Sequence, residues 1–219
     1  MTQGTALTVG GTTSVTTSAD HGTITLNTAT NAFTGAVTLT TNDADGAVAS
    51  ATIDGGTTAL VIAASTVDGD LTLTSGGAIT DGGTLTIGGN LSATADADDV
   101  TINLGTLAVD GTVALTTNGS SGNVTVVNDA GLAFAASTVD GTLSATATTG
   151  NITDSGALTI SGTSAFTTSA DHGTITLNTT TNAFTGAVTL TTNDADGAVA
   201  SATIDGGTTA LVIAASTVD

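Results

Sequence analysis

The chain repeats itself at two scales, and this constrains its fold more than any other feature of the sequence. Residues 6–68 recur as residues 157–219, 151 positions later, with six differences in 63 positions. Within this super-repeat, shorter segments start with glycine and continue with alternating apolar residues. Repetition at such periods is the sequence signature of a repeat architecture. We therefore expect residues 1–219 to form a single domain of stacked repeats.

Eight of the shorter segments align on their first glycine. Counted from one first glycine to the next, the spacings are 24, 34, 20, 22, 30, 21 and 24, and the first six add up to the super-repeat of 151. The second and fourth residues after the glycine are mostly apolar, and the fifth is Thr in every segment. The first glycines are Gly11, Gly35, Gly69, Gly89, Gly111, Gly141, Gly162 and Gly186. This alternation predicts strands with one buried face and one exposed face.

A second turn, of the form Asx-x-Gly, recurs in five consecutive segments and is followed by another short apolar strand, as in Asp81-Gly82-Gly83 before TLTI. A segment with about three short strands cannot bury its inner face alone, but it can when each segment stacks on the last. The sequence thus predicts an all-β, parallel β-helix (β-solenoid) with about eight coils and three short strands per coil. In the long segments, which start at Gly35, Gly111 and Gly186, we expect a lengthened strand or a protruding loop.

Composition excludes several functions. The chain has no Lys or Arg, and its 19 acidic residues, all Asp, give a net charge of -19. Nucleic-acid binding is not expected, since cationic side chains carry that affinity. No apolar run approaches the roughly 18 to 20 residues of a membrane span, so no membrane insertion is expected. The absence of cysteine suits a long-lived extracellular structure that does not depend on disulfides.

The glycine-started coils, Asx-x-Gly turns and Ala/Thr/Val/Leu strands of GTLSATATTGNITDSGALTISG resemble the repeats of filamentous haemagglutinin-like adhesins and other giant bacterial surface proteins. This resemblance covers essentially the whole chain. It implies a right-handed β-helix that is secreted or on a cell surface and serves as a shaft, stalk or fibre. The expected partners are the chain itself, by end-to-end stacking, or neighbouring repeats of a longer chain. The resemblance implies no ligand and no site residues.

Clustered aspartates in the turns raise the hypothesis of calcium binding. Carboxylates beside a turn glycine can ligate Ca²⁺ through oxygen, whereas the alternative interpretation is a solvated acidic turn without a metal. Neither the TNDADGA cluster nor the ADADDV cluster contains a complete DxDxDG loop or a distal Glu. We also expect Asp54 to stack on Asp81, and Asp129 on Asp154, one coil apart. The candidate metal ligands are Asp43, Asp45, Asp96, Asp98, Asp99, Asp194 and Asp196.

Two other function classes fit the sequence less well. Outward Thr-x-Thr rows, such as Thr72/Thr74, are similar to the ice-binding face of some antifreeze proteins, but Ala114 and Ala165 interrupt the row. The run from Ser18 to His21 holds Ser, Asp and His in one turn, which does not give the convergent geometry of a catalytic triad. We therefore expect no enzyme activity, and we interpret His21 and His172 as surface turn residues six coils apart.

Overall fold

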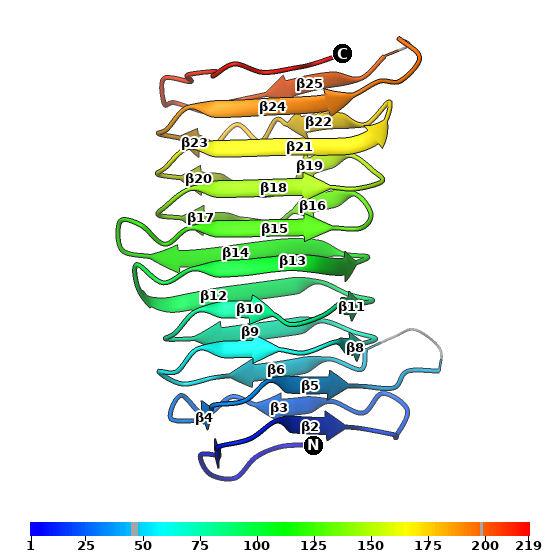
Figure 1. The fold of residues 1–219 in the computed structure, drawn as a ribbon, viewed down its shortest axis with the longest axis vertical. Coiled ribbons are helices and arrows are strands. Elements are labelled where there is room, and N and C mark those ends of the chain that lie inside the picture. Colours follow the sequence, from blue (N-terminus) through cyan, green and yellow to red (C-terminus); the bar gives the residue numbers. More distant parts are fainter. Residues whose placement is uncertain (45–47, 198) are drawn as a thin grey trace.

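The computed structural model describes residues 1–44, 48–197 and 199–219, which form an elongated stack of parallel strands (Figure 1). Every described secondary-structure element is a strand, and from β2 to β24 the chain winds through eight turns. The predicted all-β parallel β-solenoid is confirmed. Two sheets run the length of the stack, and a short pair, β1 (Thr8–Val9) and β4 (Ala32–Phe33), lies near the N-terminal end.

The two long sheets hold the remaining strands. The first sheet contains β2 (Thr13–Thr16), β5 (Val37–Thr40), β7 (Leu60–Ile62), β8 (Ser65–Val67), β10 (Ile79–Asp81), β11 (Leu85–Ile87), β13 (Ile102–Val109), β15 (Val124–Asn128), β18 (Leu143–Ala147), β21 (Ser164–Asp171) and β24 (Val188–Asn193). The second sheet contains β3 (Ile24–Leu26), β6 (Ala51–Asp54), β9 (Leu71–Ser75), β12 (Leu91–Asp98), β14 (Thr112–Asn118), β16 (Leu132–Phe134), β17 (Ser137–Val139), β19 (Ile152–Asp154), β20 (Leu158–Ile160), β22 (Thr174–Leu177), β23 (Ala183–Phe184) and β25 (Ser201–Ile204).

Similar residue types stack in register along each sheet. Leu91 of β12 pairs with Leu71 of β9 on one side and with Val113 of β14 on the other, and all three are at most 1% exposed. The alternation read from the sequence thus places one residue of each pair in a single continuous core. Near the C-terminal end this core includes Phe166, whose ring contacts those of Phe134 and Phe184 edge to face at 6.1 Å.

Threonines form columns on the outer faces of both sheets. In the second sheet five consecutive rungs carry Thr at one position: Thr74, Thr94, Thr116, Thr138 and Thr159. In the first sheet a similar column contains Thr16, Thr40, Thr66 and Thr86. A neighbouring outward column is interrupted by alanine in each sheet. In the second sheet Ser92 pairs with Ala114, and in the first sheet Ser144 pairs with Ala165. Stacked β-branched side chains stabilise a parallel sheet at such positions.

The long segments differ from expectation in how they stack. β5 follows Gly35 and pairs with β2 on one side and with β7 and β8 on the other, while β9, which follows Gly69, pairs with β6. The segment from Gly35 therefore makes about one and a half turns, and the next segment starts on the opposite sheet. The segment from Gly111 does the same, because β18, which follows Gly141, pairs with β15. Most of the extra length is an added half turn.

The added half turns change the expected stacking. From β2 to β21 the first sheet passes through seven steps, so one super-repeat makes seven turns rather than six. The predicted stack of Asp54 on Asp81 is wrong, because Asp54 pairs with Thr74 and Asp81 with Ile62. Asp154 likewise pairs with Phe134 rather than with Asp129. The sequence did not reveal this because both sheets carry the same apolar alternation.

Candidate functional site

Three structurally equivalent turns stand out by their backbone conformation. His21, Asp99 and His172 have φ angles of 57°, 61° and 58°, and they are the only non-glycine residues with positive φ in the part of the chain that the structure describes. Each is the tenth residue after a segment glycine, namely after Gly11, Gly89 and Gly162. Asn, Asp and His adopt this left-handed conformation more readily than most residues do. The recurrence indicates one turn design used three times.

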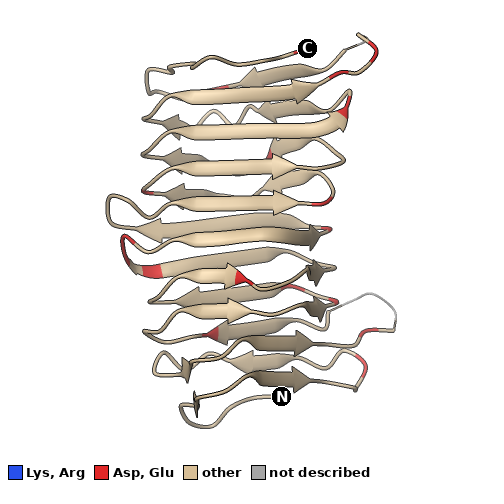
Figure 2. Cartoon of the chain, in the orientation of Figure 1, with Lys and Arg blue, Asp and Glu red and all other residues tan. Residues whose placement is uncertain are grey.

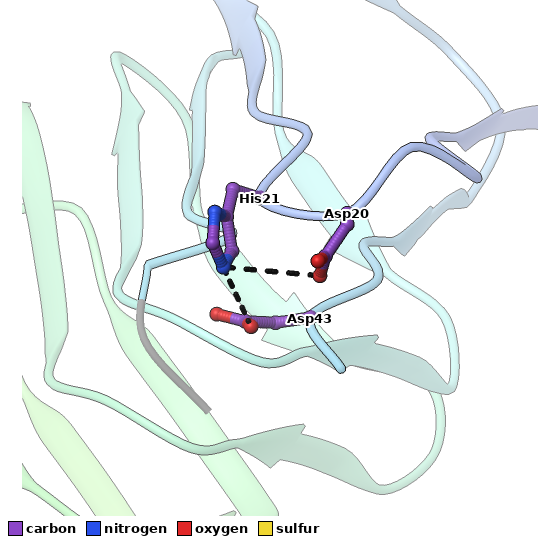
Figure 3. Close-up of side chains that lie close together, drawn as sticks. All are labelled: Asp20, His21 and Asp43. Carbon is purple, nitrogen blue, oxygen red and sulfur yellow. Dashed lines mark ion pairs between the residues drawn. The ribbon is translucent and has the colours of Figure 1, made fainter. Parts of the chain in front are cut away.

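In the first of these turns a histidine faces two carboxylates (Figure 3). The His21 Nε2 atom lies 3.4 Å from Asp43 Oδ1 and 3.8 Å from Asp20 Oδ1. Asp20 precedes the histidine in the same turn, whereas Asp43 comes from the next turn of the solenoid, after β5. The Asp43 side chain is 0% exposed and that of His21 is 44% exposed. The amide of Ala44 donates a 2.8 Å hydrogen bond to Asp20 Oδ1.

The turn at His172 repeats this arrangement. Its Nε2 atom lies 3.5 Å from Asp194 Oδ1, 3.8 Å from Asp171 Oδ1 and 2.7 Å from Asp196 Oδ1. The hydrogen bond with Asp196 and the negative charge of Asp171 raise the pKa of His172 above its usual value of 6.5. Asp171 Oδ1 also accepts a 2.8 Å hydrogen bond from the amide of Ala195. The histidine therefore faces carboxylates from two successive turns.

The turn at Asp99 has the same backbone and the opposite chemistry. Asp99 Oδ1 accepts hydrogen bonds of 2.7 Å from the Ser120 amide and 2.8 Å from the Ser121 amide. These bonds, the one from the Ser120 amide first, lower the pKa of Asp99 below 3.8. Asn118 pairs with Asp98, and Asn193 pairs with Asp171, so the two asparagines occupy equivalent positions. The residue that follows is Gly119 at the Asp99 turn and Asp194 at the His172 turn.

The structure brings together only part of the predicted metal set. Asp43 joins the His21 turn, and Asp194 and Asp196 join the His172 turn. Asp45 lies outside the described residues. Asp96 and Asp98 are exposed on β12, and Asp99 binds amides as described above. Among the described residues, the side-chain groups close enough to hold one metal are the two that contain histidine: Asp20, His21 and Asp43, and Asp171, His172 and Asp194.

Sequence reasoning missed the histidines and the aspartate before each of them. It treated each turn alone, whereas the clusters form between successive turns. A signal was present, since the tenth position after the segment glycine is His or Asp in five of the eight segments, namely at His21, Asp45, Asp99, His172 and Asp196. His21 and His172 lie seven turns apart, about 34 Å at roughly 4.8 Å per strand, so they belong to separate clusters.

The aspartates lie mainly in turns and near strand ends along the sides of the stack (Figure 2). The sequence contains no Lys or Arg to balance them. The charged partners available to these carboxylates are thus histidine imidazolium, the N-terminal amine and ions from solution. Backbone amides and neutral side chains also donate hydrogen bonds to them, as Thr106 Oγ1 does to Asp81 and Asn182 Nδ2 does to Asp154. No helix of the described residues is long and apolar enough to cross a membrane.

The fold defines a repeat protein of the parallel β-solenoid class. Residues 1–40, 45–116 and 121–191 match a family described as repeats of unknown function (DUF5649), and the chain belongs to this family. The last two matched segments begin at positions 45 and 121, a separation of about half of the super-repeat. Asp99 lies close to the midpoint in sequence between His21 and His172, which follows the same half-period. No curated protein and no solved structure matches the chain.

Proposed function

We propose that this chain is a structural segment, a shaft, stalk or fibre, of an extracellular repeat protein or adhesin that is secreted or held at the cell surface. One observation carries the proposal: the parallel ladder and its core continue from rung to rung along the whole described stack. A solenoid of this kind gives length and stiffness because each turn contacts only its neighbours. The resemblance to filamentous haemagglutinin-like repeats supports the same assignment.

The surface chemistry fits a shaft. With a net charge of -19 and no Lys or Arg, the sides of neighbouring rods repel one another in dilute salt. The outer faces of both sheets carry threonine columns. These features favour separated, soluble rods over lateral sheets. Without Lys or Arg the chain also lacks the cationic side chains that would bind an anionic substrate, which supports a role without catalysis.

The C-terminal end of the stack offers a surface for a further coil. Ile213 and Val218 are 47% and 45% exposed, whereas their copies Ile62 and Val67 are 0% and 1% exposed. The inner copies are covered by the next rung, since Ile62 pairs with Asp81 and Val67 with Ile87. We propose that an equivalent rung covers the end surface, supplied by a second copy stacking end to end or by a neighbouring repeat of a longer chain.

Negative-stain electron microscopy of the purified chain tests the proposal at matched ionic strength in Ca²⁺ and in EDTA. We expect unbranched rods whose lengths are multiples of one chain, with shortening in EDTA if calcium contributes to the joints. The variant Ile213→Asp/Val218→Asp should shorten the rods to single copies, whereas Thr125→Asp on an exposed lateral position should not. Compact particles without a rod shape would overturn the shaft assignment.

A further inference from the structure

We propose that the turns of His21 and His172 each bind one divalent transition-metal ion of the zinc type. The ligands are the Nε2 atom of the histidine, the carboxylate of the preceding aspartate, and the carboxylate of Asp43 or Asp194 from the next turn. This inference goes beyond a shaft function, because it assigns a metal site with a defined chemistry. It does not depend on filament formation.

The distances between the ligand atoms support a shared ion. A tetrahedral ion with bonds of about 2.0 to 2.2 Å separates its ligands by roughly 3.3 to 3.6 Å. His21 Nε2 and Asp43 Oδ1 are 3.4 Å apart, and His172 Nε2 and Asp194 Oδ1 are 3.5 Å apart. Both separations are longer than an ordinary hydrogen bond that a nitrogen donates to an oxygen. The preceding aspartates, at 3.8 Å in both clusters, need only a small rotation to join.

The ligand types select the metal. Calcium takes six to eight oxygen ligands, and an imidazole nitrogen is not among its usual donors. Imidazole with carboxylates suits zinc and similar first-row ions instead. Each cluster offers one nitrogen and two carboxylates, which leaves a fourth position for water. At the His172 turn, Asp196 Oδ1 is 2.7 Å from Nε2, which is the distance of a direct hydrogen bond and too short for two ligands of one ion, so this bond has to open when a metal binds.

The protein holds these ligands in place before any metal arrives. Each histidine has a positive φ, and its ring faces a carboxylate of the next turn, as Figure 3 shows for His21 and as the contact with Asp194 shows for His172. Backbone amides orient the carboxylates: Ala44 donates to Asp20, and Ala195 donates to Asp171. The side chains of Asp43 and Asp194 are 0% and 1% exposed, which limits their freedom to swing away. An ion bound here connects two successive turns.

The Asp99 turn supplies an internal comparison. It shares the left-handed backbone but has Gly119 where the clusters have Asp43 or Asp194, and amides of Ser120 and Ser121 bind its carboxylate. The two turns with a histidine therefore face a carboxylate from the next turn, whereas the turn with Asp99 faces amide donors there. The competing explanation for the histidines is a simple ion pair with the carboxylates, and direct metal titration separates the two.

The test is calorimetric titration of ZnCl₂ into the untagged full chain, in roughly 0.5 M NaCl to screen ions attracted only by net charge. We expect two saturable equivalents per chain that excess CaCl₂ does not displace. Each single variant, His21→Asn or His172→Asn, should keep one equivalent. The double variant should bind about 100-fold more weakly or not at all, and the control Asp99→Asn should still bind two. Bound Co²⁺ should show the visible absorption of a tetrahedral site.

Three results would overturn the proposal. The first is no saturable zinc binding by the wild-type chain. The second is many weak zinc ions that Ca²⁺ displaces, which is the behaviour of a diffuse anionic surface. The third is unchanged stoichiometry in the histidine variants. Because each single variant leaves the other cluster intact, a fold change at one turn cannot hide the outcome, and circular dichroism checks the fold of every variant.

Discussion

The turns of His172 and Asp99 are built on the same backbone and differ in what faces it. Their φ angles are 58° and 61°, and their amides donate equivalent hydrogen bonds, to the carbonyls of Asn193 at 3.0 Å and Asn118 at 2.8 Å. His172 faces three carboxylates, whereas Asp99 faces two backbone amides. The backbone conformation is therefore the same at His172 and Asp99. What differs is the facing part of the next solenoid winding, which complements the charge of the residue with positive φ.

This matching has a physical cause in a chain without Lys or Arg. A carboxylate beside another carboxylate gains no relief from a neighbouring cation side chain. At the Asp99 turn the relief comes from the backbone amides of Ser120 and Ser121, which donate hydrogen bonds to Oδ1. At the His172 turn it comes from the imidazole. Exchanging either half of a matched pair should therefore cost stability.

The largest effect is expected from Gly119→Asp, which places the residue of the His172 turn into the Asp99 turn. Gly119 has a φ of +96°, and an added Cβ would lie 2.5 Å from Asp99 Oδ1 and 2.7 Å from the Asp99 amide nitrogen. Strain and crowding together should lower the free energy of unfolding by about 2 to 3 kcal/mol. For a chain of this size that corresponds to a fall in Tm of about 5 to 10 °C, measurable by calorimetry.

A matched control is Gly197→Ala. Gly197 also has positive φ, at +78°, but beyond its chain neighbours no atom of the described residues lies within 4 Å of an added Cβ. Only the backbone preference is then lost, at about 1 kcal/mol. An equal loss in the two variants would mean that crowding against Asp99 does not matter, and the two turns would be less closely matched than described above.

A smaller effect is expected from the reverse exchange, His172→Asp. The new carboxylate would keep the left-handed backbone but face Asp171, Asp194 and Asp196. We expect a lower urea midpoint in dilute buffer that recovers at about 1 M NaCl, where the Debye length is about 3 Å. His172→Asn, which tolerates the same backbone without adding charge, should lose less. A loss that is the same at both salt concentrations would argue against repulsion as its cause.

The stacked parallel strands of this fold were predicted from the sequence, but the extra half turns of the long segments were not. Alternating apolar residues and segment glycines predicted stacked parallel strands, and the register of Leu71, Leu91 and Val113 confirms them. The extra half turn after Gly35 was not predicted, because strands of both sheets share one pattern and only the pairing of β9 with β6 distinguishes them. Asp43 was chosen as a metal candidate for its neighbours in sequence, yet its nearest histidine, His21, lies one turn away.

The smallest effect concerns pH, and the two turns should respond with opposite sign. The pKa of Asp99 is lowered from 3.8, so its contribution to stability is present above pH 3.8 and is lost as pH falls through the folded-state pKa. The pKa of His172 is raised from 6.5, so its contribution is complete below pH 6.5 and is lost as pH rises through the folded-state pKa. Both groups are exposed, which keeps the effects small.

Unfolding free energies measured in EDTA across the pH range should show both signs. Asp99→Asn should be less stable than the wild type at neutral pH and approach it in strong acid, whereas His172→Asn should differ in mildly acidic buffer and approach the wild type in alkaline buffer. An NMR titration should place the His172 pKa above 6.5, and Asp196→Asn should bring it down, because the bond to Asp196 is the largest cause of the shift. A His172 pKa at or below 6.5 would mean that the carboxylates of the next turn do not stabilise its charged form, and the matching of charge between turns would then hold at Asp99 alone.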